Sequence, residues 1–475
     1  MNYIVIDQGT SSTKAFLFDT NGKIIHSNQA KYNLNRPKPF HIECDPQIIL
    51  DDISRLFYEM RALSKSESVR GVGFAFQRST FLFWEKLTCK PLTPAISWQD
   101  TRAAKTLKNF DQHKQKLWNI TGSPLSAKFG GPKFFYMVKN NRTLNDKIKN
   151  NEVYFGPLSS FITHAITGSP AVDESIAGRT LLYNGRKGKW STFATDLFNV
   201  PINCLPPITP TKHDYGLMLD SDIPLLTVIG DQQAALIGQS GLKKGSIGTN
   251  FGTSASVQYN VGSVLTVLPG LISSTLFSYK SERIFMVEGT INACNSIFHY
   301  LENILSIPHK DMLWDKRIKN IDTQGIFVPG FSGISAPYWK SGFDDVCVDL
   351  GSDPNQIIRA GMESIGFLFN DILNCFKSNG MKIPKTLTAS GGAGRPVLLQ
   401  FISSLIDLEI CYFDQKDRTA IGVYRILSGN HFKDKSENRN RKSFKPKPLT
   451  YKNRKIAKWT ETLINLNIKD NYSEM

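Results

Sequence analysis

The chain has 475 residues, of which 41% are hydrophobic and 21% are charged, and this composition is typical of a globular protein with two or three domains. No segment approaches the roughly 18 apolar residues that span a membrane, and no basic-then-apolar leader precedes the first strand. Seven scattered cysteines without a C-x-x-C pair argue against a disulfide framework or a zinc site. We therefore expect a cytoplasmic protein with no membrane partner.

The net charge of +16 is concentrated in one segment near the C-terminus. Residues 431–455 contain ten lysines and arginines but only two acidic residues. Because the segment includes Pro446 and Pro448 and few apolar residues, it is predicted to be a loop or an extended tail. Binding of nucleic acid is one interpretation, and it predicts salt-sensitive retention on DNA that is lost when the segment is deleted. Most such basic runs are simply solvated, so we expect no nucleic-acid partner.

Residues 4–19 show the pattern of a hairpin, with two short apolar strands around a polar turn that begins at Gly9. The turn offers backbone N–H groups and hydroxyl donors, which together suit anionic oxygens. Its hydroxyl residues are Thr10, Ser11 and Ser12. Asp7, at the end of the first strand, supplies a hard carboxylate suited to Mg²⁺ or to a water in its shell. An ordinary surface hairpin is the alternative.

Helical and strand-like patterns alternate through the rest of the first half, which indicates an α/β fold. A helix is predicted for residues 45–60, which have apolar residues at helical spacing behind an Asp-Pro start. Strands are predicted for residues 69–76, 80–84, 93–98, 153–161 and 225–229. The boundary between the halves is expected near residues 242–245.

A second set of elements begins at residue 248. Residues 250–259 are predicted to be strand-like around a Gly-Thr-Ser turn. Strands are predicted for residues 284–287, 326–328 and 387–390, and an amphipathic helix for residues 355–376. A loop rich in glycine and proline spans residues 330–337, and a glycine turn and a helix follow the last strand. We therefore expect two domains, residues 1–241 and residues 242–475, with the basic segment 431–455 in the second.

Three turns rich in glycine and hydroxyl residues follow apolar strands, at residues 9–12, 252–254 and 391–393. Walker A, G-x-G-x-x-G and G-x-S-x-G motifs are all missing from the sequence. Single glycine turns after strands are common. Three of them in two α/β halves suggest a nucleotide held in a cleft between the domains.

Asp231 follows a predicted strand that ends at Gly230 and precedes a predicted helix. One interpretation is a helix N-cap, which is a common position for aspartate. The other is a carboxylate at the carboxyl end of a strand, facing the cleft, which accepts a proton from a substrate hydroxyl that attacks a γ-phosphate. The spacing alone favours neither.

A set of motifs in a fixed order resembles the FGGY carbohydrate kinase family, and most closely its glycerol kinase branch. The motifs are Asp7-Gln8-Gly9-Thr10-Ser11-Ser12, Gln77-Arg78, Trp98-Gln99-Asp100-Thr101-Arg102, Gly230-Asp231-Gln232-Gln233-Ala234-Ala235, Ala336-Pro337-Tyr338-Trp339, Ile358-Arg359-Ala360, Glu363-Ser364 and Gly391-Gly392-Ala393. They extend from Tyr3 to about Gly429. One motif alone would be weak support, but the ordered set is highly specific.

The resemblance implies two ribonuclease-H-like domains of the actin, Hsp70 and hexokinase type that close on ATP, Mg²⁺ and a polyol or sugar. Asp231 would be the general base and Asp7 would organise Mg²⁺. The residues implied for ATP are Thr10, Ser11, Ser12, Gly252, Thr253, Gly330, Gly333, Gly391, Gly392 and Ala393. Those implied for the substrate are Gln77, Arg78, Trp98, Asp100, Lys128 and Gln232. A homodimer is compatible with this assignment.

The chain departs from the family pattern at several positions. Ser79 stands where the glycerol kinase branch has an acidic residue, Lys128 where it has a tyrosine and Ser256 where it has an aromatic residue. Relative to the family pattern, the site loses a carboxylate that accepts hydrogen bonds and two aromatic rings, and it gains the ammonium of Lys128. These changes point to a larger or anionic substrate, and the alternative is that Lys128 faces solvent. Asp349 and Arg418 also depart from the family pattern, and nucleotide affinity could be altered.

These residues support two hypotheses about function, one of an enzyme and one of a regulator. The first is an ATP-dependent kinase acting on a polyol or sugar, which predicts ADP release with Mg-ATP and the correct acceptor. The second is a degenerate homologue that binds nucleotide and acts as a regulator, motivated by Ser79, Lys128 and Arg418. It predicts ATP binding without acceptor-dependent ADP release. Because the residues that the chemistry most needs are present, the first reading is favoured.

Overall fold

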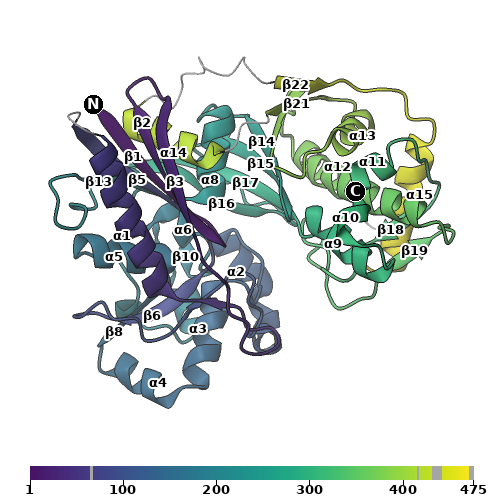
Figure 1. The fold of residues 1–475 in the computed structure, drawn as a ribbon. Helices are drawn as coiled ribbons and strands as arrows, with labels where there is room; N and C mark the ends of the chain where they lie inside the picture. Colours follow the sequence, from purple (N-terminus) through teal and green to yellow (C-terminus); the bar gives the residue numbers. More distant parts are fainter. Residues whose placement is uncertain (65–67, 414–416, 430–440, 470–475) are drawn as a thin grey trace.

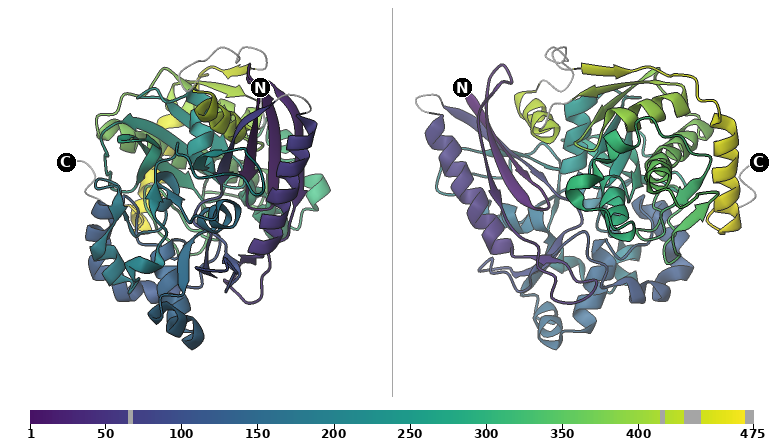
Figure 2. Two further views of the ribbon diagram at one scale, coloured as in Figure 1. Left: turned by 90° about the vertical axis from the view of Figure 1, so that its left-hand side faces the viewer. Right: turned by 45° about the vertical axis from the view of Figure 1, so that its right-hand side comes forward.

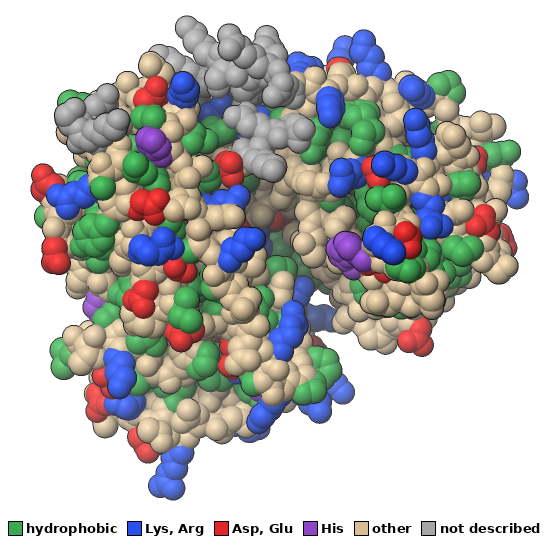
Figure 3. Space-filling model, viewed as in Figure 1, with side chains coloured by type: hydrophobic (Ala, Val, Ile, Leu, Met, Phe, Trp, Pro, Cys, Tyr) green, Lys and Arg blue, Asp and Glu red, His purple; other side chains and the backbone are tan. Residues whose placement is uncertain are grey.

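The structure, a computed structural model, describes residues 1–64, 68–413, 417–429 and 441–469. Two lobes with a hollow between them make up the molecule (Figures 1 and 3). Within the described residues, no helix is long and apolar enough to cross a membrane.

The first lobe contains a five-stranded sheet in the order β13-β5-β1-β2-β3. Its strands are β1 (Asn2–Gln8), β2 (Ser12–Asp19), β3 (Ile24–Lys31), β5 (Val69–Phe76) and β13 (Leu225–Gly230). The first three strands pair antiparallel, whereas β1, β5 and β13 are parallel. Helix α1 (Pro46–Leu63) lies along one face of this sheet (Figure 2). It begins at an Asp45 side chain that accepts a hydrogen bond from the Gln47 N–H, as expected for an N-cap.

Strand β4 and residues between β5 and β13 build the lower part of the first lobe around a sheet in the order β4-β7-β6-β8 (Figure 1). The strands are β4 (Glu43–Cys44), β6 (Phe81–Glu85), β7 (Ala95–Ile96) and β8 (Val153–Pro157). The helices are η1 (Ala104–His113), α2 (Lys114–Thr121), α3 (Gly130–Lys139), α4 (Arg142–Lys149), α5 (Leu158–Thr167), α6 (Glu174–Ala177), α7 (Thr192–Leu197) and η2 (Ile202–Cys204). Short strand pairs join β9 (Val172–Asp173) to β12 (Ile208–Thr209) and β10 (Tyr183–Asn184) to β11 (Lys189–Trp190).

The second lobe is built on a seven-stranded sheet in the order β16-β17-β15-β14-β20-β21-β22. Its strands are β14 (Ile247–Phe251), β15 (Ala255–Gly262), β16 (Ile272–Tyr279), β17 (Glu282–Ile291), β20 (Thr386–Ser390), β21 (Glu409–Phe413) and β22 (Arg441–Phe444). A separate pair joins β18 (Ile326–Val328) to β19 (Val346–Val348). The helices of this lobe are α9 (Asn295–Ile304), α10 (His309–Met312), α11 (Trp314–Arg317), α12 (Pro354–Ser378), α13 (Pro396–Ile406) and α15 (Lys452–Asn465).

Two helices connect the lobes. Helix α8 (Asp231–Ser240) follows β13 directly, and α14 (Arg418–Ser428) returns from the second lobe to pack against α8 and the first sheet. The two helices approach so closely that a Cβ added to Gly422 would lie 1.9 Å from the Ala234 carbonyl oxygen. A Cβ added to Gly238 would lie 2.0 Å from the Arg418 carbonyl oxygen. Glycine at both positions therefore permits the contact.

Most strand and helix predictions are confirmed, and three need correction. Only residues 95–96 of the predicted strand 93–98 pair as a strand, and the predicted strand 153–161 stops at Pro157 because helix α5 begins at Leu158. The basic segment 431–455 is not a loop throughout. Residues 431–440 lie outside the described residues, 441–444 form β22, and the helix α15 begins at Lys452. The domain boundary at 241/242 stays a prediction.

Candidate active site

The carboxyl ends of three parallel strands bring the strongest candidate residues to one edge of the first sheet. Asp7 lies near the end of β1, Arg78 follows β5, and Asp231 follows β13. In an open α/β sheet this edge is where ligands bind. The turn after β1 is closed by the Gly9 N–H, which donates to the Ser12 carbonyl oxygen at 2.9 Å. The hairpin predicted from residues 4–19 is therefore confirmed.

Asp7 and Asp231 lie close enough to influence each other electrostatically. Burial and the nearby Asp231 carboxylate raise the pKa of Asp7 to about 7, although Lys14, its partner across the hairpin, opposes the shift. Lys14 also forms an ion pair with Asp417 at 3.0 Å, which ties the hairpin to the start of α14. Two neighbouring carboxylates repel each other when both are ionised. A cation bound beside them would therefore be favoured.

Asp231 does not cap its helix. It is the first residue of α8, and the N-cap is Gly230, which has no side chain to accept a bond. Its Oδ1 accepts a hydrogen bond from the Gln232 N–H at 2.7 Å and lies 3.5 Å from Arg78 Nε. Burial raises the pKa of Asp231, and Arg78 acts in the opposite direction. The Asp231 side chain is 25% exposed.

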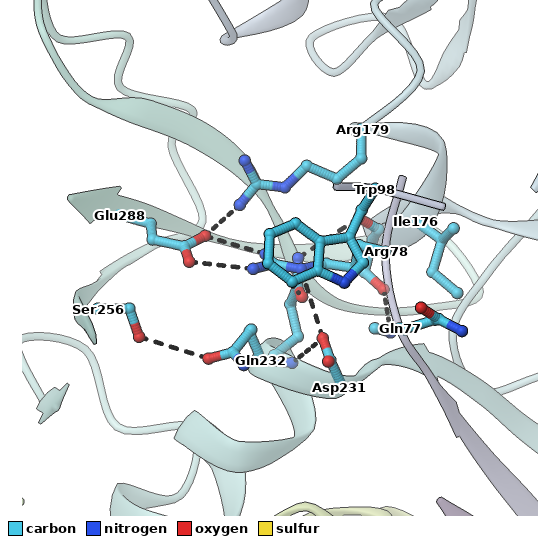
Figure 4. Close-up of polar contacts among 12 residues, drawn as sticks. Gln77, Arg78, Trp98, Ile176, Arg179, Asp231, Gln232, Ser256 and Glu288 are labelled. Atoms are coloured by element: carbon cyan, nitrogen blue, oxygen red, sulfur yellow. Dashed lines mark hydrogen bonds and ion pairs between the residues drawn. The ribbon is translucent and has the colours of Figure 1, made fainter. Parts of the chain in front are cut away.

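Arg78 is held between Asp231 and a carboxylate from the other lobe (Figure 4). Its Nη1 and Nη2 donate to Oε2 and Oε1 of Glu288 at 2.9 and 3.0 Å. Arg179 also pairs with Glu288. Although burial opposes ionisation, the two guanidinium groups lower the pKa of Glu288 to about 2. The charged network fixes Arg78 beside the proposed base.

Two further predicted residues join the site through hydrogen bonds. The indole Nε1 of Trp98 donates to Thr10 Oγ1 at 2.9 Å, so a residue implied for the substrate contacts a residue implied for phosphate. Ser256 Oγ donates to Gln232 Oε1 at 3.4 Å (Figure 4). Because Ser256 lies just beyond the 252–254 turn, this bond places that turn close to Asp231.

Gln77 and Asp100 are engaged inside the protein. The Gln77 amide Nε2 lies 3.2 Å from the Gly9 carbonyl oxygen and 3.1 Å from the Tyr32 hydroxyl. The fully buried Asp100 carboxylate accepts bonds from the Ile42 N–H and from the Arg102 guanidinium. These bonds brace the turn and the loop that carries Trp98, and direct contact of either side chain with substrate stays a prediction.

Lys128 lies near the loops that carry Arg78 and Trp98. The Lys133 ammonium is fully buried and donates to the carbonyl oxygens of Ser79 and Ser97 at 3.0 and 2.7 Å. Burial, with smaller contributions from the nearby Arg102 and Lys128 charges, lowers the pKa of Lys133 to about 7, and Asp100 acts in the opposite direction. Burial also lowers the pKa of Lys128, whose ammonium makes no ion pair within the described part of the chain.

The glycine turns of the second lobe also come together. The Ala393 N–H donates to the Phe251 carbonyl oxygen at 2.9 Å, which joins the 391–393 turn to the 252–254 turn. Gly391 has a φ of +101°, and a Cβ there would lie 2.3 Å from the same oxygen. Asn292, which follows β17, donates to the carbonyl oxygens of Ser332 and Gly333. The loop that holds Gly330 and Gly333 is thereby tied to the end of β17.

The sequence motifs do not indicate three residues of this site, which are Glu288, Arg179 and Lys133. Glu288 carried one signal, because it is a carboxylate inside the apolar run of β17, where a charge is costly without a partner. Nothing in the sequence indicated which arginines would pair with it.

Comparison with known proteins finds matches over most of the chain. The model for the FGGY family of carbohydrate kinases, N-terminal domain, matches residues 2–238, and the model for the C-terminal domain matches residues 249–427. A glycerol kinase of Aeromonas salmonicida is 30% identical over 435 residues, which cover 88% of this chain and 87% of that protein. A glycerol kinase of Enterococcus casseliflavus is 28% identical and covers 92% of this chain and 90% of its own length.

Solved structures share the fold over nearly the whole chain. Plasmodium falciparum glycerol kinase with ADP superposes with a TM-score of 0.87 at 25% identity and covers 98% of this chain and 99% of its own. Gluconate kinase from Lactobacillus acidophilus gives a TM-score of 0.87 at 19% identity, with full coverage of both chains. The expected α/β fold of the carbohydrate kinases, with two actin- or hexokinase-like domains, is confirmed.

Proposed function

The chain belongs to the FGGY family of carbohydrate kinases, and we propose that it transfers the γ-phosphate of ATP to a hydroxyl of a polyol, a sugar or a related acid, with Asp231 as the general base. The observation that carries this proposal is the position of Asp231. It stands beside Asp7 at the carboxyl edge of the first sheet, and its neighbour Gln232 is bonded to Ser256 near a glycine turn of the second lobe. The phosphate acceptor, the phosphate donor ATP and the base Asp231 can therefore meet in one cleft.

The residues on this edge fit a divalent cation. Asp7 is a hard oxygen donor, and its pKa is raised by burial and by the nearby Asp231 carboxylate. We propose that Asp7 organises Mg²⁺, which when bound would neutralise charge on the β- and γ-phosphate oxygens. The hydroxyls of Thr10, Ser11 and Ser12 would hold phosphate oxygens. The turns at residues 252–253, 330–333 and 391–393 would hold the rest of the nucleotide.

Asp231 can take the proton of the attacking hydroxyl because its carboxylate is held in place and burial raises its pKa, which makes it a stronger base. The Gln232 N–H and the Arg78 guanidinium fix the orientation of its carboxylate, and a positioned base is most of what phosphoryl transfer needs from side chains. Closing of the lobes would exclude the water that otherwise competes with the acceptor.

The acceptor that these residues favour carries a negative charge. Lys128 offers an ammonium that burial destabilises and that no described carboxylate neutralises. Ser79 and Ser256 are smaller than the acidic and aromatic residues of the glycerol kinase pattern at these positions. A carboxylate on a polyol or sugar acid would pair with Lys128, and this favours an acid over a neutral polyol such as glycerol.

A coupled assay for ADP tests the proposal. Purified protein with Mg-ATP is supplied with polyols, ketoses and aldonic acids in turn, and we expect acceptor-dependent ADP release with at least one of them. Asp231→Asn should lower kcat by about 10²–10⁴-fold, whereas Asp220→Asn on the exposed surface should not change it. Nucleotide binding without any acceptor-dependent ADP release would support the regulatory reading instead. Full turnover in Asp231→Asn would reject the base assignment.

A further inference from the structure

Three side chains that can bind a metal gather on the surface of the second lobe, where α9 leads into α10. His299 and Glu302 lie three residues apart on α9, and His309 begins α10. Their ligand atoms all lie within 4.8 Å of one another. Among the residues described, they form the one such cluster of three histidine, cysteine or acidic side chains.

The Glu302 carboxylate lies between the two imidazoles. Its Oε1 is 2.9 Å from Nδ1 of His309, and its Oε2 is 3.4 Å from Nδ1 of His299. The two rings lie nearly parallel, with centroids 5.3 Å apart. Two ligands of a tetrahedral Zn²⁺ are about 3.3 Å apart when each is about 2.0–2.1 Å from the metal. The observed separations from carboxylate to imidazole bracket that value.

The backbone between the two helices holds the cluster in this arrangement. The Ile307 N–H donates to the Glu302 carbonyl oxygen at 2.9 Å, and the Ser306 N–H donates to the Asn303 carbonyl oxygen at 3.3 Å. The turn therefore brings Pro308 and His309 back over the last turn of α9. Glu302 is only 13% exposed, whereas His309 is 77% exposed and can rotate to meet a metal without moving the core.

We propose that His299, Glu302 and His309 bind a divalent transition metal, with Zn²⁺ as the metal that best suits the site. Two imidazole nitrogens and one carboxylate oxygen favour Zn²⁺ and its neighbours over Mg²⁺ or Ca²⁺, which prefer oxygen ligands alone. Solvent would complete the coordination, because both rings are exposed. The site is separate from the residues proposed for Mg²⁺ and does not depend on the proposed kinase activity.

Bound metal would also restrict the motion of α9, the helix that supports the glycine turn at residues 252–254. The first residues of α9 hold that turn, since the N–H groups of Cys294 and Ser296 donate to the Thr253 carbonyl oxygen at 3.0 and 3.2 Å. A metal that joined α9 to α10 would reduce the freedom of the same helix. We therefore expect Zn²⁺ to raise the Tm of the protein.

Calorimetric titration of ZnCl₂ into the metal-free full-length protein tests the site. We expect one binding event that is weakened more than about tenfold in Glu302→Gln and in His309→Asn, since even the loss of an outer-shell partner costs 10–100-fold in affinity. His213→Asn, an exposed histidine elsewhere, should bind Zn²⁺ as the wild type does. The increase in Tm with Zn²⁺ should disappear in the same two variants.

Either of two results would overturn the proposal. The first is no binding of Zn²⁺ to the wild-type protein, which would make the cluster a set of hydrogen bonds alone. The second is binding that Glu302→Gln and His309→Asn leave within about threefold of wild type, which would place the metal at other residues such as the free cysteines. Circular dichroism of each variant keeps misfolding apart from loss of a ligand.

Discussion

Arg78 and Glu288 form a two-bond ion pair that joins the two sheets. Arg78 follows β5 of the first lobe and Glu288 belongs to β17 of the second, and their paired atoms are 2.9 and 3.0 Å apart. Glu288 is fully buried and also pairs with Arg179. One carboxylate thus pairs with two guanidinium groups at the place where the lobes meet, which makes the pair a fixed support for the residues around Asp231.

Removing the charge of Glu288 should destabilise the protein and weaken the site. In Glu288→Gln, two buried guanidinium groups lose their shared counter-charge, and breaking a buried pair in this way costs about 3–5 kcal/mol in the free energy of unfolding. Arg78 would then have Asp231 as its nearest carboxylate, so kcat/KM should also fall. Urea unfolding and the ADP assay measure the two effects. Glu282→Gln, at the exposed start of the same strand, serves as the control.

The stabilisation by Glu288 should depend on pH in a defined direction. Its pKa is about 2 in the folded protein, below the ordinary glutamate value of 4.5. A lowered folded-state pKa gives stability that is present above pH 4.5 and is lost as the pH falls towards 2. The difference in unfolding free energy between wild type and Glu288→Gln should therefore be constant above about pH 5 and shrink in more acidic buffers. A difference unchanged down to pH 3 would contradict this assignment.

Lys128 should set the preference for charged acceptors. In Lys128→Met the ammonium is lost but most of the side-chain volume remains, so KM for a carboxylated acceptor should rise about tenfold or more, as expected for the loss of a charge-assisted contact. Turnover of neutral polyols should stay the same or improve. Lys139→Met, at the exposed end of α3, should change neither value. Kinetics equal to those of the wild type for every acceptor in Lys128→Met would show that Lys128 does not contact the acceptor.

The crossing of α8 and α14 should tolerate no side chain at Gly422. An added Cβ would lie 1.9 Å from a backbone oxygen, which cannot rotate away as a side chain can. Gly422→Ala should force the helices apart and cost about 3 kcal/mol or more, the upper range for overpacking. Gly351→Ala, where no atom lies within 4 Å of the new Cβ, is the matched control. Thermal and urea unfolding of both variants decide the question.

The parts of the site that lie together in the sequence were predictable. The hairpin around residues 9–12 and the strand–Asp231–helix unit depend on neighbouring residues, so local patterns were enough to indicate them. The Arg78–Glu288 pair joins residues 210 positions apart. No local pattern carries such a contact, because it depends on how the two sheets are placed in space.

The errors in the predicted secondary structure have a similar cause. Residues 153–161 are all apolar or small, and a short run of this kind does not separate a buried strand from the start of a buried helix. The structure divides it at Leu158, the first residue of α5. The prediction of a loop for the basic segment rests on charge and proline content alone. Its end at residues 452–455 instead begins the amphipathic helix α15, whose inner face packs on the second lobe.

Lys455 should therefore be a structural lysine, unlike its exposed neighbours. Its side chain is 4% exposed and its ammonium pairs with Glu363 of α12, which also binds Arg359 at 2.7 Å. In Lys455→Met, Glu363 keeps one partner, Arg359. The free energy of unfolding should therefore fall by about 3 kcal/mol, the low end for a broken buried pair. Lys442→Met removes an exposed charge from β22 and should cost less than about 0.5 kcal/mol. Equal urea midpoints for the two variants would show that the pair between Lys455 and Glu363 does not stabilise the fold.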